Sequence, residues 1–334
     1  MGGAKHHSPN QHRLKTKIVI LPTKWIPQHL SYLSQISPMI SPIFAQLTPF
    51  TIWQWLTEPL ALEFMRNALI AGGLAGIICP AIGCFLIVQR MALLGDVMTH
   101  TVMPGMAIAF FWRIDVAIGA FISGLGSAFL IAWLRSQTRV KVDAAMALTS
   151  SSFFAIGILL ISLLKIKIDL HGFLFGDILS VSQTDTVRAG IITVIVLAAI
   201  AIFYKQLLFY TFDRTGAQAL GLPVNLIYLG LMAGVTLTII ASMQTMGVVL
   251  VVSLLVGPAI TAYLLVKELH QMIFMGAGLG ITASVIGLYA SYYLNLPSGP
   301  AIVLAVLLLF LVTLVFSPTQ GLFTGIKHRT KRGA

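Results

Sequence analysis

The sequence predicts an all-α, polytopic membrane protein with about nine membrane-spanning helices. Of its 334 residues, 57% are hydrophobic and only 9% are charged, whereas a soluble domain carries about 25% charged residues. Apolar runs of about 20 residues, the length needed to cross a bilayer, recur along the chain. The formal net charge of +11 lies largely in the two tails and in alternate loops. This distribution indicates membrane topology rather than nucleic-acid binding.

The spans follow one another with short connections from residue 58 onward. We expect helices over 64–88, 96–112, 115–134, 144–164, 188–205, 224–244, 247–266, 271–293 and 300–316. They make up a permease-like domain over 58–317. A basic, proline-rich N-terminal extension (1–57) precedes it, and a basic cytoplasmic tail (318–334) follows it. The prolines of the extension disfavour a clean spanning helix there.

The loops between the spans alternate in charge, and the more basic set is expected on the cytoplasmic side. That set carries Arg90, Arg135, Arg139, Lys141, Lys205, Arg214 and Lys267, and the basic C-terminal tail. Nine spans then place the N-terminal extension outside, against the preference of its own lysines. Two alternatives stay open: a further span in the extension, or a re-entrant segment among the nine.

The stretch QRMALLGDVMTHTVMPG, residues 89–105, combines charge with an apolar setting. Asp96 and His100 are four residues apart, so they share one face of a helix. Ionisable groups in a membrane span usually face a protein interior or a watery path, and both are ligands for first-row divalent metals. The alternative is a helix start with an ordinary histidine. Pro104, and later Gly257 with Pro258, are expected to break or kink their helices, as in the discontinuous helices that line transport paths.

Two loops carry further candidate sites. On the cytoplasmic side, FDRTGAQALGLP (212–223) reads as a short helix begun by Asp213 and ended at Gly221, with Arg214, Ala217 and Leu220 along it. Such a helix could dock on a soluble partner, or it could be an ordinary interfacial turn.

The second loop is external and spans residues 165–185. Asp169, His171 and Asp177 in this loop are candidates for the mouth of a cation path, against the alternative of solvated loop charge. Cys79 and Cys84, the two cysteines of the chain, lie inside the first apolar run, where a structural role is expected.

Catalytic motifs are missing from the sequence. It contains no G-x-x-x-x-G-K-[ST] phosphate loop, no HExxH and no G-x-S-x-G. We therefore expect a transport subunit rather than an enzyme, and any use of ATP would need a separate polypeptide.

Four motifs, in this order, give the chain a resemblance to a known family. They are RMALLGDVMTH-TVMPGMAIAF, DL-HGFLFGDILSVS, FDRTGAQALGL and MGVVLVVSLLVGPAITAYLL. Over residues 58–317 the chain resembles the membrane permease of the zinc/manganese/iron family of ABC importers. Thr99 stands where many relatives have serine.

The resemblance implies a homodimeric permease of the cobalamin-importer (type II) class in the cell (inner or plasma) membrane. Its implied partners are two cytoplasmic ABC ATPase subunits and an external solute-binding protein. It assigns Asp96 and His100 to the cation route and Asp213–Gly221 to the ATPase coupling helix. No permanently bound cofactor is implied. The cargo is a divalent metal: the run SSFFAIGILLISL favours manganese, LFGDILSVS leans toward zinc, and iron is a further alternative. A secondary transporter or channel that works without an ATPase is the alternative class.

Overall fold

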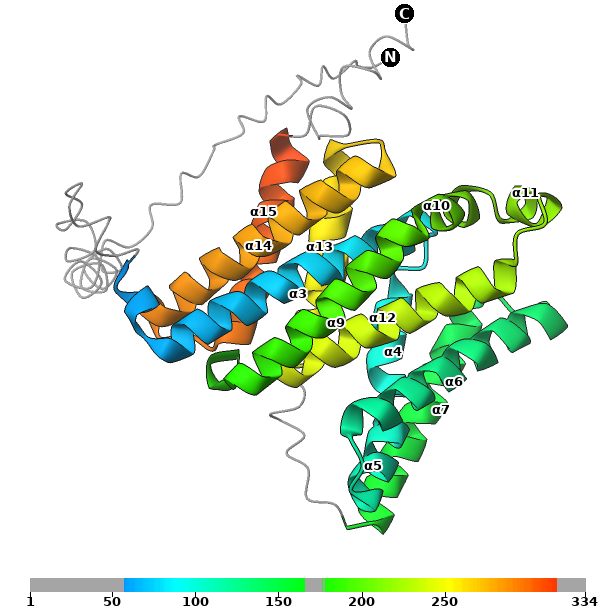
Figure 1. Cartoon of the computed structure of the whole chain (residues 1–334), viewed down its shortest axis with the longest axis horizontal. Coiled ribbons are helices and arrows are strands. Elements are labelled where there is room, and N and C mark those ends of the chain that lie inside the picture. Colours follow the sequence, from blue (N-terminus) through cyan, green and yellow to red (C-terminus); the bar gives the residue numbers. More distant parts are fainter. Residues whose placement is uncertain (1–56, 166–175, 177, 317–334) are drawn as a thin grey trace, which may run out of the picture. The chain divides into compact units, whose positions relative to one another are not determined.

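The computed structural model describes residues 57–165, 176 and 178–316 (Figure 1), and this part of the chain is helical throughout. Nine helical segments within these residues are long and apolar enough to cross a membrane. The predicted all-α polytopic fold is therefore confirmed. Asp169, His171 and Asp177 of the external loop lie outside the described residues, as do 1–56 and 317–334.

The spanning segments agree closely with the expected ones. They are α3 (Glu63–Val88), α4 and α5 together (Leu93–Trp112), α6 (Val116–Gln137), α7 (Val142–Leu163), α9 (Gln183–Ile202), α12 (Val224–Met246), α13 (Val248–Leu265), α14 (Leu269–Leu294) and α15 (Ser298–Phe316). Two short 3-10 turns, η1 (Pro59–Ala61) and η2 (Ile178–Ser180), precede α3 and α9. Helix α10 (Tyr204–Phe212) and helix α11 (Arg214–Ala219) lie between α9 and α12.

Local capping explains where the helix starts differ from expectation. Helix α9 begins five residues earlier than predicted because the Ser182 side chain accepts a hydrogen bond from the Asp185 N–H and so caps the first turn. Helix α15 begins at Ser298 and holds Pro300 in its first turn, where the missing N–H of proline costs no helical hydrogen bond. Helix α10 was not predicted, since the expected span ends at 205 and the residues after it are expected to form part of a loop.

Helix α3 is the centre of the packing, with α13 and α14 against it, and α12 joins this group to α6 and α9 (Figure 1). The α3–α14 contact depends on two glycines. A Cβ on Gly280 would lie 2.1 Å from the Gly76 carbonyl oxygen, and one on Gly76 would lie 2.7 Å from the Gly280 carbonyl carbon. The small-residue pattern at these positions therefore serves close backbone approach.

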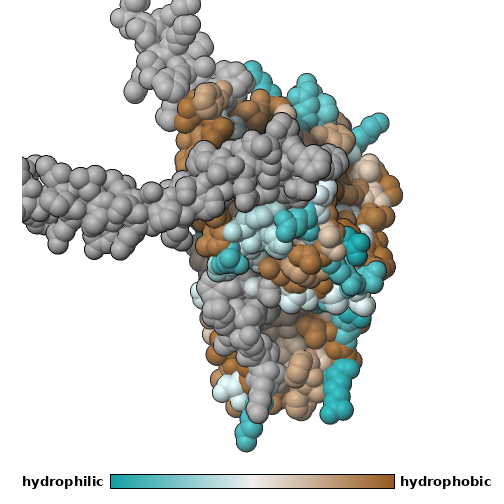
Figure 2. All heavy atoms as spheres, turned by 90° about the vertical axis from the view of Figure 1, so that its left-hand side faces the viewer, coloured by the Kyte–Doolittle hydropathy of each residue, from teal (hydrophilic) through white to brown (hydrophobic). Residues whose placement is uncertain are grey.

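The outer surface is apolar, as a bilayer requires. In Figure 2 hydrophobic residues cover much of the visible face, with hydrophilic side chains between them. Large exposed side chains include Ile122, Phe129, Leu159 and Phe274. Less than a third of the most apolar stretch of α6, α7, α9 and α15 is buried within the chain, so these helices keep wide faces for lipid or for another protein.

Candidate functional site

The span that follows α3 is divided into two helices at its middle. Helix α4 (Leu93–Thr101) ends at Val102, and α5 (Met103–Trp112) starts there with Pro104 in its first turn. Proline has no N–H to donate to the carbonyl four residues earlier, which here is that of His100. The expected helix break at Pro104 therefore occurs directly after the acid–histidine pair.

Helix α6 stabilises this break with hydroxyl groups. The Ser123 hydroxyl donates to the Thr101 carbonyl at 2.6 Å, and the Ser127 hydroxyl donates to the Thr101 hydroxyl at 2.9 Å. Ser127 and Thr101 are fully buried. The sequence reasoning missed these serines, although their spacing of four residues on an apolar helix was a signal of one polar face.

Asp96 and His100 lie next to each other on α4, as their spacing predicted. The His100 Nε2 and Asp96 Oδ1 atoms are 3.9 Å apart, and their side chains are 29% and 56% exposed. Two ligands that each lie about 2.1 Å from one metal ion can be at most about 4.2 Å apart. One cation can therefore bridge this pair without a change of backbone.

The neighbours of the pair orient it. The ring of His100 meets Phe154 of α7 edge-on, with 5.1 Å between ring centroids. On the opposite side, Gly95 allows α4 to pack on α13, since a Cβ there would lie 2.9 Å from Leu255 Cδ2. Phe154 was not singled out from the sequence, because an aromatic residue in an apolar span carries no distinctive signal.

The described residues of one chain do not complete a metal site, since no three His, Cys, Asp or Glu side chains among them gather closely enough to hold an ion. Within the same residues, His100 is the one basic side chain that pairs with Asp96. The carboxylate thus stays exposed on a membrane-spanning segment without a lysine or arginine partner.

Gly257 and Pro258 play a different part from the one expected. Helix α13 continues through Pro258, which is buried, so no interruption occurs there. Gly257 lies at the contact with α15: a Cβ on it would lie 2.1 Å from Val306 Cγ1. Its smallness serves helix packing, and the break in a span occurs only at Pro104 among the three positions named from the sequence.

The loop expected on the cytoplasmic side contains the expected short helix, α11. The Asp213 side chain caps it by accepting a hydrogen bond from the Gly216 N–H at 2.8 Å. Gly221 ends it with φ of 76°, a left-handed conformation that glycine adopts readily. Ala217 is fully buried, whereas Leu220 is 69% exposed and Arg214 is also exposed. Among the residues named from the sequence, Arg214 and Leu220, which follows the last residue of α11, can be reached by a partner, whereas Ala217 cannot.

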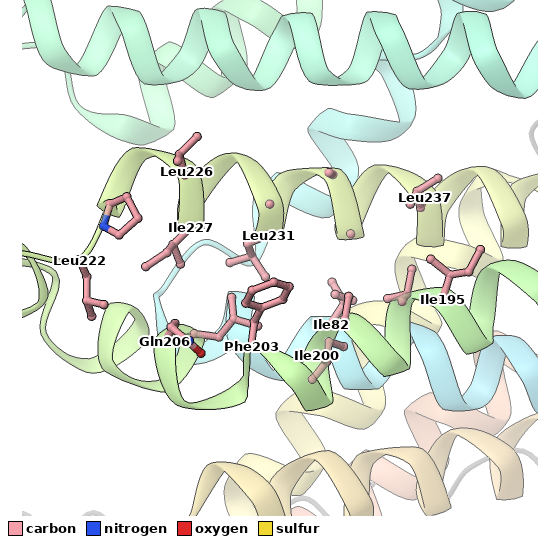
Figure 3. A pocket seen from close by; sticks show the side chains of 17 residues that line it. Ile82, Ile195, Ile200, Phe203, Gln206, Leu222, Leu226, Ile227, Leu231 and Leu237 are labelled. Carbon is pink, nitrogen blue, oxygen red and sulfur yellow. The ribbon is translucent and has the colours of Figure 1, made fainter.

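A hollow of about 550 Å³ lies away from the Asp96–His100 pair, between α3, α9, α10 and α12. Figure 3 shows aliphatic side chains such as Ile195, Ile227 and Leu231 around it, with Gln206 at one end. The residues that line it include no acid, histidine or cysteine. It therefore offers a divalent metal none of the ligand types that Asp96 and His100 offer.

Comparison with known proteins gives a consistent set of relatives. The profile of the ABC 3 transport family matches residues 61–317. The manganese transport system membrane protein MntC of Listeria monocytogenes is 40% identical over 266 residues, which cover 80% of this chain and 95% of MntC. A probable iron transport system membrane protein of Haemophilus influenzae is 35% identical, over 80% of this chain and 98% of the relative.

A solved structure extends this likeness to the fold. The complex of PsaBC from Streptococcus pneumoniae with a Fab matches with a TM-score of 0.73 at 40% identity, covering 80% of this chain and 97% of that chain. The likeness therefore extends over nearly the whole length of these relatives.

Proposed function

Because this chain belongs to the ABC 3 transport family, we propose that it is the membrane permease of an ABC importer whose cargo is manganese. Relatives at about 40% identity are named for manganese transport, which favours this metal. The probable iron transport relative keeps iron as the second candidate cargo, handled by the same residues. Hydrolysis of ATP then belongs to separate subunits, in line with the missing phosphate loop.

The observation that carries the proposal is the exposed Asp96–His100 pair on the broken span. A charged side chain at the middle of a lipid-facing helix costs about 2.5–3.5 kcal/mol on insertion scales. An unpaired carboxylate that is 56% exposed is therefore expected to face a second protein surface or a watery path.

A second copy of the chain supplies what one copy lacks. Manganese takes up to six ligands with oxygen and nitrogen donors, whereas one chain offers two at this place. In a homodimer with the two α4 helices facing each other, two acid–imidazole pairs would meet at the axis. Water would complete the coordination, and the few protein ligands would let the ion leave again.

The direction of transport comes from partners on each side. An external solute-binding protein would deliver the metal, with Asp169, His171 and Asp177 as candidates for the mouth of the path. On the cytoplasmic side two ATPase subunits would dock on α11 of the two copies. Closure of the ATPase pair would push on Leu220 at the end of α11 and so alternate access to the site.

The metal site is tested by uptake of manganese into cells or vesicles that contain the assembled importer. Asp96→Asn and His100→Gln each remove a ligand while keeping similar volume, and we expect uptake to fall by about tenfold or more, the effect of weakened metal ligation. Matched controls are Asp115→Asn, at the cap of α6, and His270→Gln, an exposed residue paired with Glu268.

Normal uptake in both site variants would remove Asp96 and His100 from the route. Competition by iron and zinc in the same assay identifies the cargo. Uptake that is inhibited more strongly by iron than by excess manganese would replace manganese with iron in the proposal.

The docking role of α11 is tested separately with Leu220→Ala. Loss of an exposed apolar anchor at a protein interface typically weakens binding by about tenfold or more, so we expect less ATPase to co-purify and slower metal-dependent hydrolysis. Leu294→Ala is the matched control, since Leu294 is 58% exposed at the end of α14, on the external side by our topology. Full coupling in Leu220→Ala would place the docking surface elsewhere.

A further inference from the structure

A second, smaller hollow of about 290 Å³ lies among the helix ends that are expected on the cytoplasmic side. The last turns of α6 and the first turns of α12 form its walls, and Arg214 at the start of α11 closes it. Figure 1 shows that α12 starts beside α11. The hollow shares no residue with the Asp96–His100 pair, nor with the apolar hollow in Figure 3.

Two guanidinium groups give this hollow its charge. Arg135 and Arg214 both line it, together with the side-chain amide of Asn225. Neither arginine forms an ion pair with an acid among the described residues. Both act on the same buried phenol beside the hollow, that of Tyr210: burial raises its pKa, and the charges of Arg214 and Arg135 oppose that rise. Two unpaired cations thus converge, and the lining contains no carboxylate.

Much of the remaining lining of the hollow is apolar. Phe129 and Trp133, one helical turn apart on α6, are 61% and 51% exposed, and both line the hollow. Tyr228 forms its floor, with its hydroxyl donating to the Ala128 carbonyl at 3.4 Å. Tryptophan is enriched where a membrane meets water, so the hollow is placed at that boundary, with cations on the water side and aromatic rings on the lipid side.

We propose that this hollow binds the headgroup of an anionic phospholipid from the cytoplasmic leaflet. The phosphate would accept hydrogen bonds from Arg135, Arg214 and Asn225, and the first part of the acyl chains would lie along Phe129 and Trp133. Basic pockets between spanning helices suit anionic headgroups, and guanidinium groups bind phosphate through paired N–H donors. A free phosphate ion would leave the exposed aromatic side of the hollow unused.

This site would link the bound lipid to the proposed ATPase-docking helix, because Arg214 is also the first residue of α11. A bound headgroup would hold the start of α11 against the ends of α6 and α12. The proposal concerns lipid and not metal, so its test is independent of the cargo.

The test is native mass spectrometry of the purified full chain in detergent, titrated with phosphatidylglycerol or with uncharged phosphatidylcholine. We expect preferential retention of phosphatidylglycerol. Each arginine near a membrane surface contributes to anionic lipid binding by about fivefold in affinity, so Arg135→Gln and Arg214→Gln should each weaken retention by about fivefold. Arg139→Gln is the control, since Arg139 lies in the loop just after α6 but does not line the hollow. Elution volumes and melting temperatures equal to those of the unaltered chain would show that the variants are folded.

Four results would overturn the proposal. Equal retention of the two lipids, or unchanged retention in the Arg135→Gln, Arg214→Gln double variant, would show that the hollow does not select an anionic headgroup. Competition by inorganic phosphate at millimolar concentration would reassign the site to a soluble anion. Complete displacement of phosphatidylglycerol on addition of the ATPase subunits would assign the two arginines to the protein interface instead.

Discussion

Replacement of Gly280 by alanine tests the central packing of the fold. A methyl group there would lie 2.1 Å from the Gly76 carbonyl oxygen, so α3 and α14 would have to separate by more than 1 Å to reach an ordinary contact distance of about 3.4 Å. Overpacking of this kind typically costs about 1–3 kcal/mol. Alanine gains about 0.5–1 kcal/mol over glycine within a helix, which offsets only part of that cost. We expect Gly280→Ala to lower the free energy of unfolding.

The same helix provides the control. Gly278 lies two residues away on α14, and a Cβ built on it meets nothing within 4 Å. Gly278→Ala should therefore keep or raise stability, so the two variants should differ in sign. The measurement is the unfolding midpoint of the purified chain in detergent, followed by tryptophan fluorescence. A Gly280→Ala midpoint equal to or above that of Gly278→Ala would refute the close approach of α3 and α14.

Two further predictions concern α11 and the thiols. Asp213→Ala removes the cap of α11 at a cost of about 1 kcal/mol, so we expect slower metal-dependent ATP hydrolysis in the assembled importer. Asp213→Ser, which can still cap, should restore the rate, and an equal loss in both would mean that the carboxylate acts in some other way. Cys79 and Cys84 are fully buried within the chain, so a maleimide should label neither until the chain is denatured. A thiol introduced as Leu220→Cys, at an exposed position, serves as the positive control, and rapid labelling of either native cysteine would place it on a water-filled path.

The spanning helices could be predicted from the sequence because the bilayer imposes one length and one composition on all of them. Their ends depended on local hydrogen bonds that an apolar pattern does not record. The Ser182 cap moved the start of α9, and α10 continues the helical path to Phe212, beyond the expected end of the span at 205. The positions of basic residues were harder to predict: Arg135, expected in a loop, lies in the last turn of α6, and Lys205 lies in α10.

The direction in which a side chain points was harder to predict. Ala217 and Leu220 are three residues apart in one short helix and both seemed suited to docking, yet only Leu220 is exposed. A helix of six residues has too few apolar positions to define its buried face. Gly257 likewise suggested a feature of the path, but its neighbour is Val306 of α15. Such facts depend on which helix lies opposite, and spacing along one helix does not contain that information.

The Asp96–His100 pair lies directly before the helix break at Pro104. Pro104 leaves the His100 carbonyl without its usual N–H partner, and the serines of α6 hydrogen-bond to Thr101 at the same turn. A polar interruption inside a span is tolerated only where protein or water surrounds it. The side of α4 toward α6 is buried, while the Asp96 side is open. The open side is therefore the one that must meet water or a second copy, and this requirement connects the proposed homodimer to the proposed cation route through a single helix.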